Sequence, residues 1–173
     1  MKYIIEKLDK NNAEEYAKIN AHAWNESYKG IVNDKFLELI NQEEEIIKTK
    51  NNLLKNLNDN SRRFLLKENN DYVGILRVRE TKYEKYSNCG ELGALYLLDK
   101  AKKKGYGKIL FKKAIEELIN MGYNDMILGC LQQNPTNEFY KHMGGILVDT
   151  SNFSLPNQEL TENIYYYKDI NNI

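Results

Sequence analysis

One stretch of the chain, residues 92–121, predicts a strand, a tight turn and a helix in immediate succession. It begins with the apolar run Leu92-Gly93-Ala94-Leu95-Tyr96-Leu97-Leu98. The turn Lys102-Lys103-Lys104-Gly105-Tyr106-Gly107 follows, and residues 108–121 have the apolar spacing of an amphipathic helix. Glycines let a backbone approach a ligand closely, and a helix N-terminus offers unpaired N–H donors. The turn therefore predicts a phosphate site, although solvated lysine clusters also occur without any ligand.

The composition favours one globular domain and disfavours several functions. At 173 residues, 42% of them hydrophobic, the chain is expected to form a single domain over residues 1–173. Its 25 basic and 25 acidic side chains cancel, which argues against a general nucleic-acid binder. No segment approaches the roughly 20 apolar residues that span a bilayer, and residues 1–10 lack a signal-peptide core. We expect a cytoplasmic protein with no nucleic-acid or membrane partner.

Potential metal ligands are few and scattered. Cys89 and Cys130 form no Cys-x-x-Cys pair, and His22 and His142 lie far apart without other ligand residues at suitable spacing. We therefore expect no metal site. In a reducing compartment the two cysteines are expected to be free thiols rather than a disulfide.

The rest of the chain predicts an α+β fold around a mixed sheet. Apolar residues at helical spacing, with capping or breaking residues at the ends, predict helices over residues 13–24, 34–40, 43–57, 106–121 and 134–143. Strands are expected over residues 3–5, 63–67, 72–80, 90–97, 125–130, 145–150 and 164–168. A long polar loop is expected between the last two strands. This order differs from the regular strand–helix alternation of a parallel α/β protein.

Two motifs resemble those of the GNAT N-acetyltransferase family. The family's acetyl-CoA-binding motif has Gln/Arg-x-x-Gly-x-Gly/Ala at a strand–helix turn, and Lys102, Gly105 and Gly107 stand at its defined positions. Residues 134–145, with Asn134, the pair Phe139-Tyr140 and then Gly-Gly, resemble the family's second signature. The motifs occur in the family's order, and the order of elements is similar over nearly the whole chain.

The resemblance implies a GNAT fold, with a central mixed, mostly antiparallel, twisted sheet of about seven strands flanked by helices. It also implies an acetyl-CoA-dependent N-acetyltransferase. The chain departs from the family pattern at Lys102, where Gln or Arg is usual, at Lys103, where glycine is common, and at Asp99, where proline is common. Lysine keeps a positive charge for phosphate but lacks the planar fork of a guanidinium. We expect the cofactor site to survive with an altered affinity.

The same resemblance implies where acetyl-CoA binds. Its pyrophosphate is expected at the turn and helix start, on Lys102, Lys103, Lys104, Gly105, Tyr106, Gly107 and Lys108. Its pantetheine is expected along the strand end Leu95, Tyr96 and Leu97, with an N–H near Leu97 polarising the thioester carbonyl. Asn134 is expected to contact the pantetheine, or only to cap its helix.

Direct attack of an amine on the thioester requires two proton transfers. The amine, with a pKa of about 10, must lose a proton, and the CoA thiolate must gain one. Tyr140 resembles the family's general acid, and the alternative is an ordinary core aromatic residue. Glu91 is the candidate base, because several members of the family that the chain resembles place a base carboxylate at this offset, eleven residues before Lys102, and strand alternation would place it on the side of Leu95 and Leu97. The alternative for Glu91 is a solvent-exposed carboxylate at a strand end.

The acceptor is expected beside residues 23–30, because this loop commonly walls the acceptor site in the family. Trp24, Glu26 and Tyr28 would suit a cationic amine, or Trp24 and Tyr28 belong to the core. A small polyamine or amino sugar is the first expectation, based on Glu26, Asp34 and the aromatic residues. A protein N-terminus or lysine is the second acceptor class, and a homodimer through the last strands is a further possibility.

Two other functions stay open at this point. A non-catalytic acyl-CoA-binding module could sense CoA or regulate a partner, although Tyr140 and Glu91 argue for an enzyme. A domain for another nucleotide could use the same turn. The chain lacks the Gly-x-x-x-x-Gly-Lys-[Ser/Thr] motif of a P-loop NTPase, which disfavours that alternative.

Overall fold

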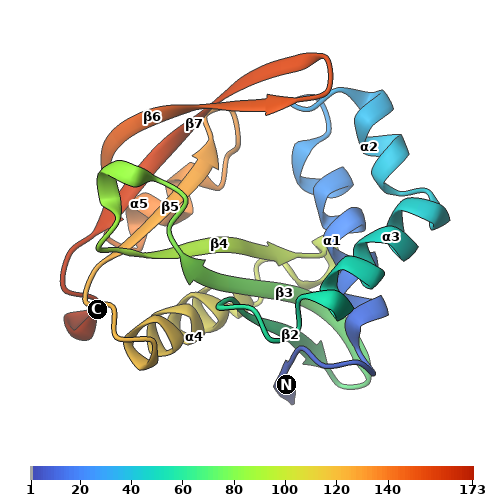
Figure 1. Ribbon diagram of the computed structural model, residues 1–173, viewed down its shortest axis with the longest axis horizontal. Helices are drawn as coiled ribbons and strands as arrows, with labels where there is room; N and C mark the ends of the chain where they lie inside the picture. The colour runs from blue at the N-terminus through green and yellow to red at the C-terminus, as the bar shows by residue number, and fades with distance from the viewer. Residues whose placement is uncertain (1) are drawn as a thin grey trace.

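A seven-stranded mixed sheet forms the centre of the molecule (Figure 1). The computed structural model describes residues 2–173. In spatial order the strands are β1 (Tyr3–Lys7), β2 (Arg62–Glu68), β3 (Asp71–Glu80), β4 (Gly90–Leu97), β5 (Met126–Leu131), β7 (Gln158–Tyr167) and β6 (Ile146–Leu155). Neighbouring strands are antiparallel except β4 and β5, which are parallel. The expected α+β fold with a mostly antiparallel sheet is confirmed.

Helices cover both faces of the sheet (Figure 1). They are α1 (Ala13–Tyr28), α2 (Asp34–Ile40), α3 (Glu43–Lys55), α4 (Tyr106–Asn120) and α5 (Asn137–His142). Strand alternation divides the apolar side chains between the two layers, since Leu65 and Ile75 pack against α1 while Leu66 and Leu76 pack against α4. None of the helices within residues 2–173 is long and apolar enough to cross a membrane.

Helix α1 is longer than the sequence predicts. It was expected to end near Trp24, but it continues to Tyr28. The polar residues Asn25 and Glu26 are exposed, so they form the solvent face of the helix rather than a break. Tyr28, one turn after Trp24, is buried. The helix stops just before Gly30, whose φ of +79° no helix interior accommodates.

The predicted polar loop between the last two strands is wrong, because this segment forms a long hairpin. Strands β6 and β7 pair from Ile146 with Tyr166 to Leu155 with Gln158. Two residues join them, and the second, Asn157, has a φ of +61°, which asparagine tolerates. Along β6, exposed residues alternate with half-buried ones, so polar side chains are compatible with a strand there.

Strand β6 also forms one edge of the sheet. Near its start Ile146, Leu147 and Val148 are exposed. Exposed apolar residues on an edge strand are suited to pairing with another chain. The expected homodimer through the last strands stays a prediction.

Strands β4 and β5 separate soon after they begin. They pair only through Gly90 with Met126 and Glu91 with Ile127. On its other edge β4 pairs with β3 as far as Leu97. The β4 edge over residues 92–97 therefore has no strand partner within the described chain, and its backbone groups are available to a ligand.

A bulge at Gly93 reverses the alternation of side chains along β4. Leu92 pairs with Val78 and Ala94 with Arg77, which leaves Gly93 without a partner in the register. Leu95 and Leu97 consequently pack in the layer of α4. Glu91 lines a cavity on the opposite face, together with Ala94 and Tyr96. The expectation that Glu91 shares a side with Leu95 and Leu97 is wrong, because the extra residue shifts the period-2 pattern.

Buried tyrosines should make the fold sensitive to alkali. Burial raises the pKa of Tyr16 to about 12 and the pKa of Tyr28 and Tyr140 well above the ordinary value. The pKa of a tyrosine in the unfolded chain is about 10, so the folded protein holds the tyrosine proton more tightly. The free energy of unfolding that this contributes is fully present below pH 10 and is lost as the pH rises through the folded-state pKa. We expect the free energy of unfolding, measured with urea, to fall between pH 10 and pH 12.

Tyrosine-to-phenylalanine variants separate this effect from lysine titration over the same range. Tyr16→Phe should show a shallower alkaline decline than the parent protein. Tyrosinate absorbance should rise together with unfolding. A decline of identical slope in both proteins would contradict the assignment to Tyr16.

Candidate active site

Two cavities meet where β4 leaves β5. One, of about 340 Å³, lies between the end of β4, the start of α4 and α5, and we call it the α4 cavity. The other, of about 440 Å³, lies between α1, β3, β4 and the β6–β7 hairpin, and we call it the α1 cavity. Residues that line both are Tyr28, Leu92, Gly93, Ala94, Tyr96 and Gly129. Groups held in the two cavities can therefore meet at this junction.

The turn before α4 forms the floor of one end of the α4 cavity. Gly105, at the N-cap, has a φ of +86°, the left-handed conformation that glycine adopts without strain. Gly107 and Lys108 lie in the first helical turn, whose N–H groups have no acceptor within the helix, and both line the cavity. This backbone and the helix dipole suit an anion such as a phosphate.

The lysines of this turn are not equivalent. Lys102 and Lys104 each form an ion pair with a neighbouring carboxylate, at 2.7 Å and 3.0 Å. Within residues 2–173 no carboxylate pairs with Lys103 or Lys108, and both line the α4 cavity. Lys103 and Lys108 are therefore the better placed to attract phosphate, whereas Lys104 and Tyr106 lie outside the cavity lining.

Lys103 adopts a left-handed backbone conformation, with a φ of +61°. Such a conformation costs a residue with a side chain roughly 1–2 kcal/mol, and glycine avoids this cost. Part of the gain from a substitution by glycine is lost again, because glycine loses more backbone entropy on folding than lysine does. We expect Lys103→Gly to raise the free energy of unfolding by about 0.5–1 kcal/mol in urea denaturation. Lys102→Gly, at a φ of −67°, is the matched control and should lower it. A gain in both variants, or in neither, would count against this explanation.

Tyr140 stands on α5 at the side of the α4 cavity. Its side chain is 7% exposed, and no group among residues 2–173 hydrogen-bonds to its hydroxyl. Its backbone carbonyl accepts a hydrogen bond from the Tyr167 hydroxyl at 2.8 Å, which fixes the helix. Burial raises the pKa of Tyr140 well above the ordinary value, so the hydroxyl stays protonated at neutral pH. A protonated hydroxyl without a partner can donate to a ligand.

Asn134 lies beside Tyr140 in the lining of the α4 cavity. Its Oδ1 accepts the Thr136 N–H at 2.9 Å, so the side chain does cap the turn before α5. The neighbouring Asn137, for which the sequence predicted no role, holds this segment in place. Asn137 donates to the Leu131 carbonyl at 2.8 Å and accepts from the Tyr165 hydroxyl at 2.8 Å.

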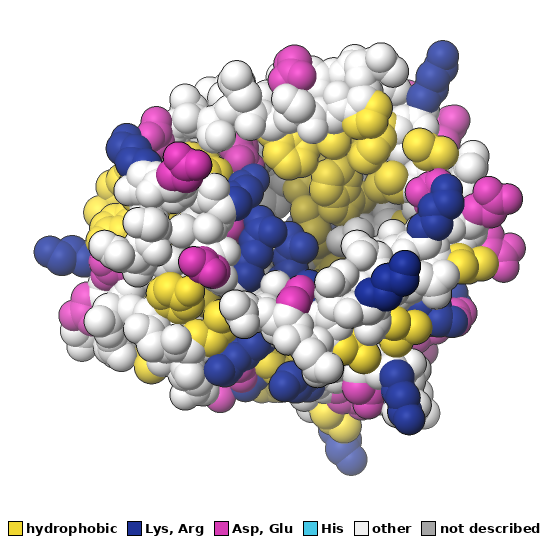
Figure 2. Space-filling view, in the orientation of Figure 1, with side chains coloured by type: hydrophobic (Ala, Val, Ile, Leu, Met, Phe, Trp, Pro, Cys, Tyr) yellow, Lys and Arg dark blue, Asp and Glu magenta, His cyan; other side chains and the backbone are white. Residues whose placement is uncertain are grey.

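Aromatic side chains form one wall of the α1 cavity, which is the hollow seen in Figure 2. Trp24 makes an edge contact with Tyr28, with ring centroids 4.9 Å apart, and lies 6.4 Å from both Tyr96 and Phe153. The Tyr28 and Tyr96 hydroxyls are 3.0 Å apart. Trp24 and Tyr28 thus pack between helix and sheet and line the cavity at the same time. Phe153 was not anticipated, because β6 was expected to end before it.

Glu26 does not join Trp24 and Tyr28 in the cavity. It is exposed and lines neither cavity. Its carboxylate accepts the backbone N–H of Asp99 at 2.6 Å, which ties the end of α1 to the segment after β4. The structure thus brings two of the three predicted acceptor residues together.

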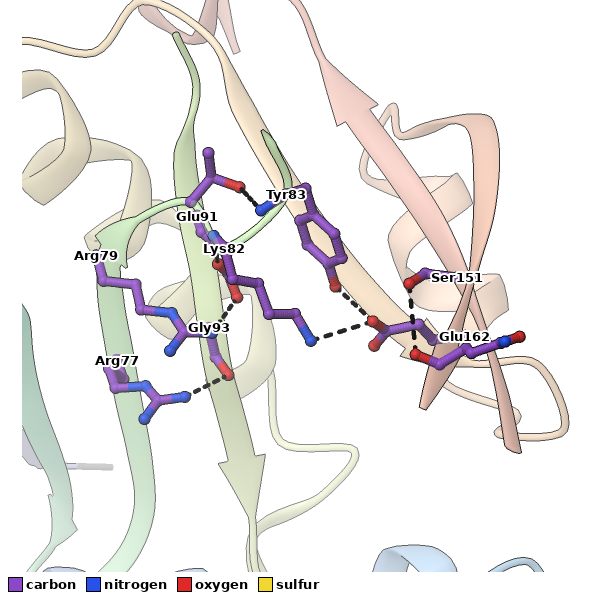
Figure 3. A network of polar contacts seen from close by, with 10 residues as sticks. Arg77, Arg79, Lys82, Tyr83, Glu91, Gly93, Ser151 and Glu162 are labelled. Atoms are coloured by element: carbon purple, nitrogen blue, oxygen red, sulfur yellow. Dashed lines mark hydrogen bonds and ion pairs between the residues drawn. The ribbon is translucent and has the colours of Figure 1, made fainter. Parts of the chain in front are cut away.

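Charged side chains form the opposite wall (Figures 2 and 3). Glu91 is 3% exposed, and both of its carboxylate oxygens are engaged. One accepts from the Arg79 guanidinium at 2.7 Å and the other from the backbone N–H of Lys82 at 2.8 Å. Glu91 lines the α1 cavity, but its immediate partners are protein groups.

Glu162 on β7 is a second carboxylate in this wall that could not be predicted from the sequence. Its Oε1 accepts from the Tyr83 hydroxyl at 2.7 Å and from Lys82 Nζ at 3.1 Å (Figure 3). Its Oε2 has no hydrogen-bond partner within residues 2–173. A Cβ on Gly129 would collide with this carboxylate, so Glu162 lies directly against the junction of the cavities.

One cysteine, Cys130, lines the α4 cavity, and neither His22 nor His142 lines either cavity. Cys89 and Cys130 are buried free thiols, as expected. In the described chain, residues 2–173, no three His, Cys, Asp or Glu side chains are grouped as metal ligands would be. The expectation that no metal takes part stays a prediction.

Comparisons with known proteins identify the family to which the chain belongs. The model of the acetyltransferase (GNAT) family matches residues 21–144. The chain is 28% identical over 147 residues to the uncharacterized N-acetyltransferase YuaI of Bacillus subtilis, an alignment that covers 84% of this chain and 82% of YuaI. The chain therefore belongs to the GNAT family and is an acetyl-CoA-dependent N-acetyltransferase by class.

Solved structures share the fold at low sequence identity. The PaiA N-acetyltransferase of Thermoplasma acidophilum, solved with coenzyme A, has a TM-score of 0.74 and 20% identity and covers 97% of this chain and 99% of its own. The YncA protein of Salmonella typhimurium, solved with acetyl-CoA, has a TM-score of 0.71 and 15% identity, and the match covers 96% of this chain and 93% of YncA. The expected GNAT fold is confirmed.

Proposed function

We propose that this protein transfers the acetyl group of acetyl-CoA to a primary amine by direct attack in a ternary complex. The observation that carries the proposal is the junction of the two cavities at Gly93 and Gly129. A thioester in the α4 cavity and an amine in the α1 cavity would meet there without a covalent enzyme intermediate. Holding two reactants in contact supplies a large part of the rate enhancement in such reactions.

Acetyl-CoA fits the α4 cavity by its chemistry. The pyrophosphate would lie on the backbone of Gly105, Gly107 and Lys108, with Lys103 and Lys108 as its cations. The pantetheine amides would hydrogen-bond to the unpaired β4 edge over residues 92–97, as an added strand does. Solved relatives in fold that hold coenzyme A or acetyl-CoA support this choice of ligand.

The reaction forms a bond between the amine nitrogen and the acetyl carbon and breaks the carbon–sulfur bond. We assign Tyr140 as the general acid that gives its proton to the departing thiolate. The amine proton leaves, directly or through a water, to Glu91 or Glu162. Glu162 is favoured because its Oε2 lies at the junction and has no hydrogen-bond partner in the described part of the chain, whereas Arg79 and Lys82 occupy both oxygens of Glu91.

Thiol release from acetyl-CoA in the presence of a broad amine panel tests the proposal. We expect initial-rate lines that intersect when both substrates are varied, and no acetylated protein after incubation with acetyl-CoA alone. Tight CoA binding without turnover above hydrolysis on the whole panel would overturn the proposed reaction. An acetylated protein intermediate would overturn direct attack.

The two candidate bases can be distinguished by the rates of their glutamine variants. For the parent protein kcat/KM should rise toward alkaline pH, since the amine must be deprotonated before it attacks. We expect Glu162→Gln to lower kcat/KM about a hundredfold. Glu91→Gln is the matched comparison and should lower kcat/KM less. If neither variant lowers kcat/KM, no carboxylate of this wall is the base.

A further inference from the structure

The α1 cavity contains an arginine, Arg77, that forms no ion pair with a carboxylate within residues 2–173. Arg77 on β3 lines the cavity, and its one hydrogen bond within residues 2–173 runs from Nη2 to the Gly93 carbonyl at 3.4 Å. Its Nε is buried without a partner. Burial, and then the nearby Arg79, lower the pKa of Arg77. Arg77 is half-buried, and a partly desolvated cation without an ion-pair partner is costly, so a bound anion would relieve a cost that the folded chain carries.

Arg77 is the centre of a row of three arginines. Arg63 lies directly opposite on β2, and Arg79 follows two residues later on the same face of β3. Asp59 holds Arg63 with two hydrogen bonds of 2.9 Å and 2.7 Å, and Glu91 holds Arg79 at 2.7 Å. The outer two arginines are therefore paired, and the charge of the middle one is left for another group.

The free donors of this row point toward the junction of the cavities. A Cβ on Gly93 would lie 3.1 Å from the Nε of Arg77 and 3.2 Å from the Nε of Arg79, and the Nε of Arg79 is also buried without a partner. Figure 3 shows both arginines reaching from β3 toward β4 at Gly93. Among the charged residues that line the α1 cavity, four are basic and two acidic: Arg63, Arg77, Arg79, Lys82, Glu91 and Glu162.

This charge does not suit the polyamine that the sequence alone suggested. The carboxylates behind that expectation were Glu26 and Asp34, and neither lines the α1 cavity. A polycation would meet an excess of positive charge beside Arg77. The α4 turn cannot use the charge of Arg77 either, because Arg77 lines only the α1 cavity.

We propose that the acceptor is a small amine that carries a carboxylate close to its nitrogen, an amino acid or a similar compound, and that Arg77 binds this carboxylate with help from Arg79. This inference rests on the proposed acetyl transfer. The planar fork of a guanidinium matches a carboxylate in geometry and charge. With the carboxylate at Gly93, the amine lies at the junction, and the aromatic wall of Trp24, Tyr28 and Phe153 would accept an apolar or aromatic side chain.

Matched acceptors test the inference. Phenylalanine and 2-phenylethylamine differ only in the carboxylate, and spermidine represents the polyamines. We expect kcat/KM for phenylalanine to exceed that for 2-phenylethylamine about a hundredfold, mainly through KM, as the loss of a hydrogen bond to a charged group implies. Phenylalanine, but not 2-phenylethylamine, should also raise the Tm of the CoA-bound protein.

Methionine is similar to arginine in length but carries no charge. The Arg77→Met variant should bring the ratio of kcat/KM for phenylalanine to kcat/KM for 2-phenylethylamine close to one, and it should abolish the Tm shift with phenylalanine. Arg77→Lys should keep part of both effects. Arg62→Met is the control, because Arg62 pairs with Glu117 outside both cavities, and it should leave the ratio as in the parent protein.

The outcomes separate this inference from the proposed function. If no amine of any class is acetylated, the proposed function fails. If 2-phenylethylamine or spermidine is acetylated as efficiently as phenylalanine, the acetyl transfer stands and the carboxylate inference is overturned. An unchanged ratio in Arg77→Met would overturn the role of Arg77 in the same way.

Discussion

Replacement of Tyr140 by phenylalanine should lower kcat about a hundredfold or more while the CoA dissociation constant changes less than threefold. Proton transfer from a positioned side chain contributes about 10²–10⁴ to enzyme rates. Tyr140 lines the α4 cavity, and its protonated hydroxyl has no hydrogen-bond partner within residues 2–173. The phenyl ring would keep its contacts with Phe139 and Tyr165, at centroid distances of 5.4 Å and 6.2 Å. Steady-state thiol release measures kcat, and calorimetric titration with CoA measures binding.

Tyr166→Phe is the matched control for the loss of a hydroxyl. Tyr166 donates to Asp125 at 2.8 Å, and it lines neither the α4 nor the α1 cavity. Its variant should lose about 1 kcal/mol of stability and keep the kcat of the parent protein. Equal kcat in Tyr140→Phe and the parent would show that another group, or water, protonates the thiolate.

The α4 cavity could be predicted from the sequence because its parts are close together in the chain. The end of β4, the glycine turn and the start of α4 follow one another within residues 95–108, and α5 adds one further short motif. Hydrogen-bond donors of a glycine turn and a helix start are properties of the local backbone. The ion pair of Lys104 with Glu68 could not be assigned this way, because it depends on tertiary structure, whereas Lys102 pairs with Asp99 only three residues earlier in the chain.

The α1 cavity could not be predicted because it is assembled from distant segments. Arg63 and Arg77 are ordinary strand residues in the sequence, and only the pairing of β2 with β3 places them opposite each other. Glu162 and Phe153 fell in a segment whose polar residues indicated a loop. A weak signal for the hairpin was present, since Pro156-Asn157 is a turn pair between two stretches of alternating character.

The face of β4 on which Glu91 lies could not be predicted for a different reason. Alternation with a period of two gives the correct faces for Leu95 and Leu97 relative to each other. A single bulge at Gly93 reverses the pattern for every residue before it. Glycine inside a strand is the usual sign of such a bulge, but the sequence does not say whether a given glycine forms one.

Replacement of Gly107 by valine should weaken CoA binding about a hundredfold or more without unfolding the protein. A Cβ at this position would lie 3.6 Å from the Phe139 ring and 3.9 Å from a Leu97 methyl group, which are ordinary contact distances. The fold therefore accommodates a Cβ at this position, which points toward two residues of the α4 cavity lining, and we expect the methyl groups of valine to occupy the part of the cavity where the pyrophosphate must approach the helix start. Calorimetric titration with CoA and urea denaturation measure the two effects separately, and a hundredfold loss is about 2.7 kcal/mol of binding.

Two further variants decide what contributes more to CoA affinity at this turn, the close approach of the pyrophosphate to the backbone or the charge of the lysines. Lys108→Ala should cost tenfold or less in CoA affinity, because one solvated cation contributes about 1 kcal/mol or less. Gly105→Val should instead lower the free energy of unfolding, since its φ of +86° strains a β-branched residue while a Cβ there would meet open space. If Gly107→Val binds CoA as tightly as the parent protein, the pyrophosphate does not lie at this turn. If Lys108→Ala loses more affinity than Gly107→Val, charge rather than close approach to the helix start holds the phosphate.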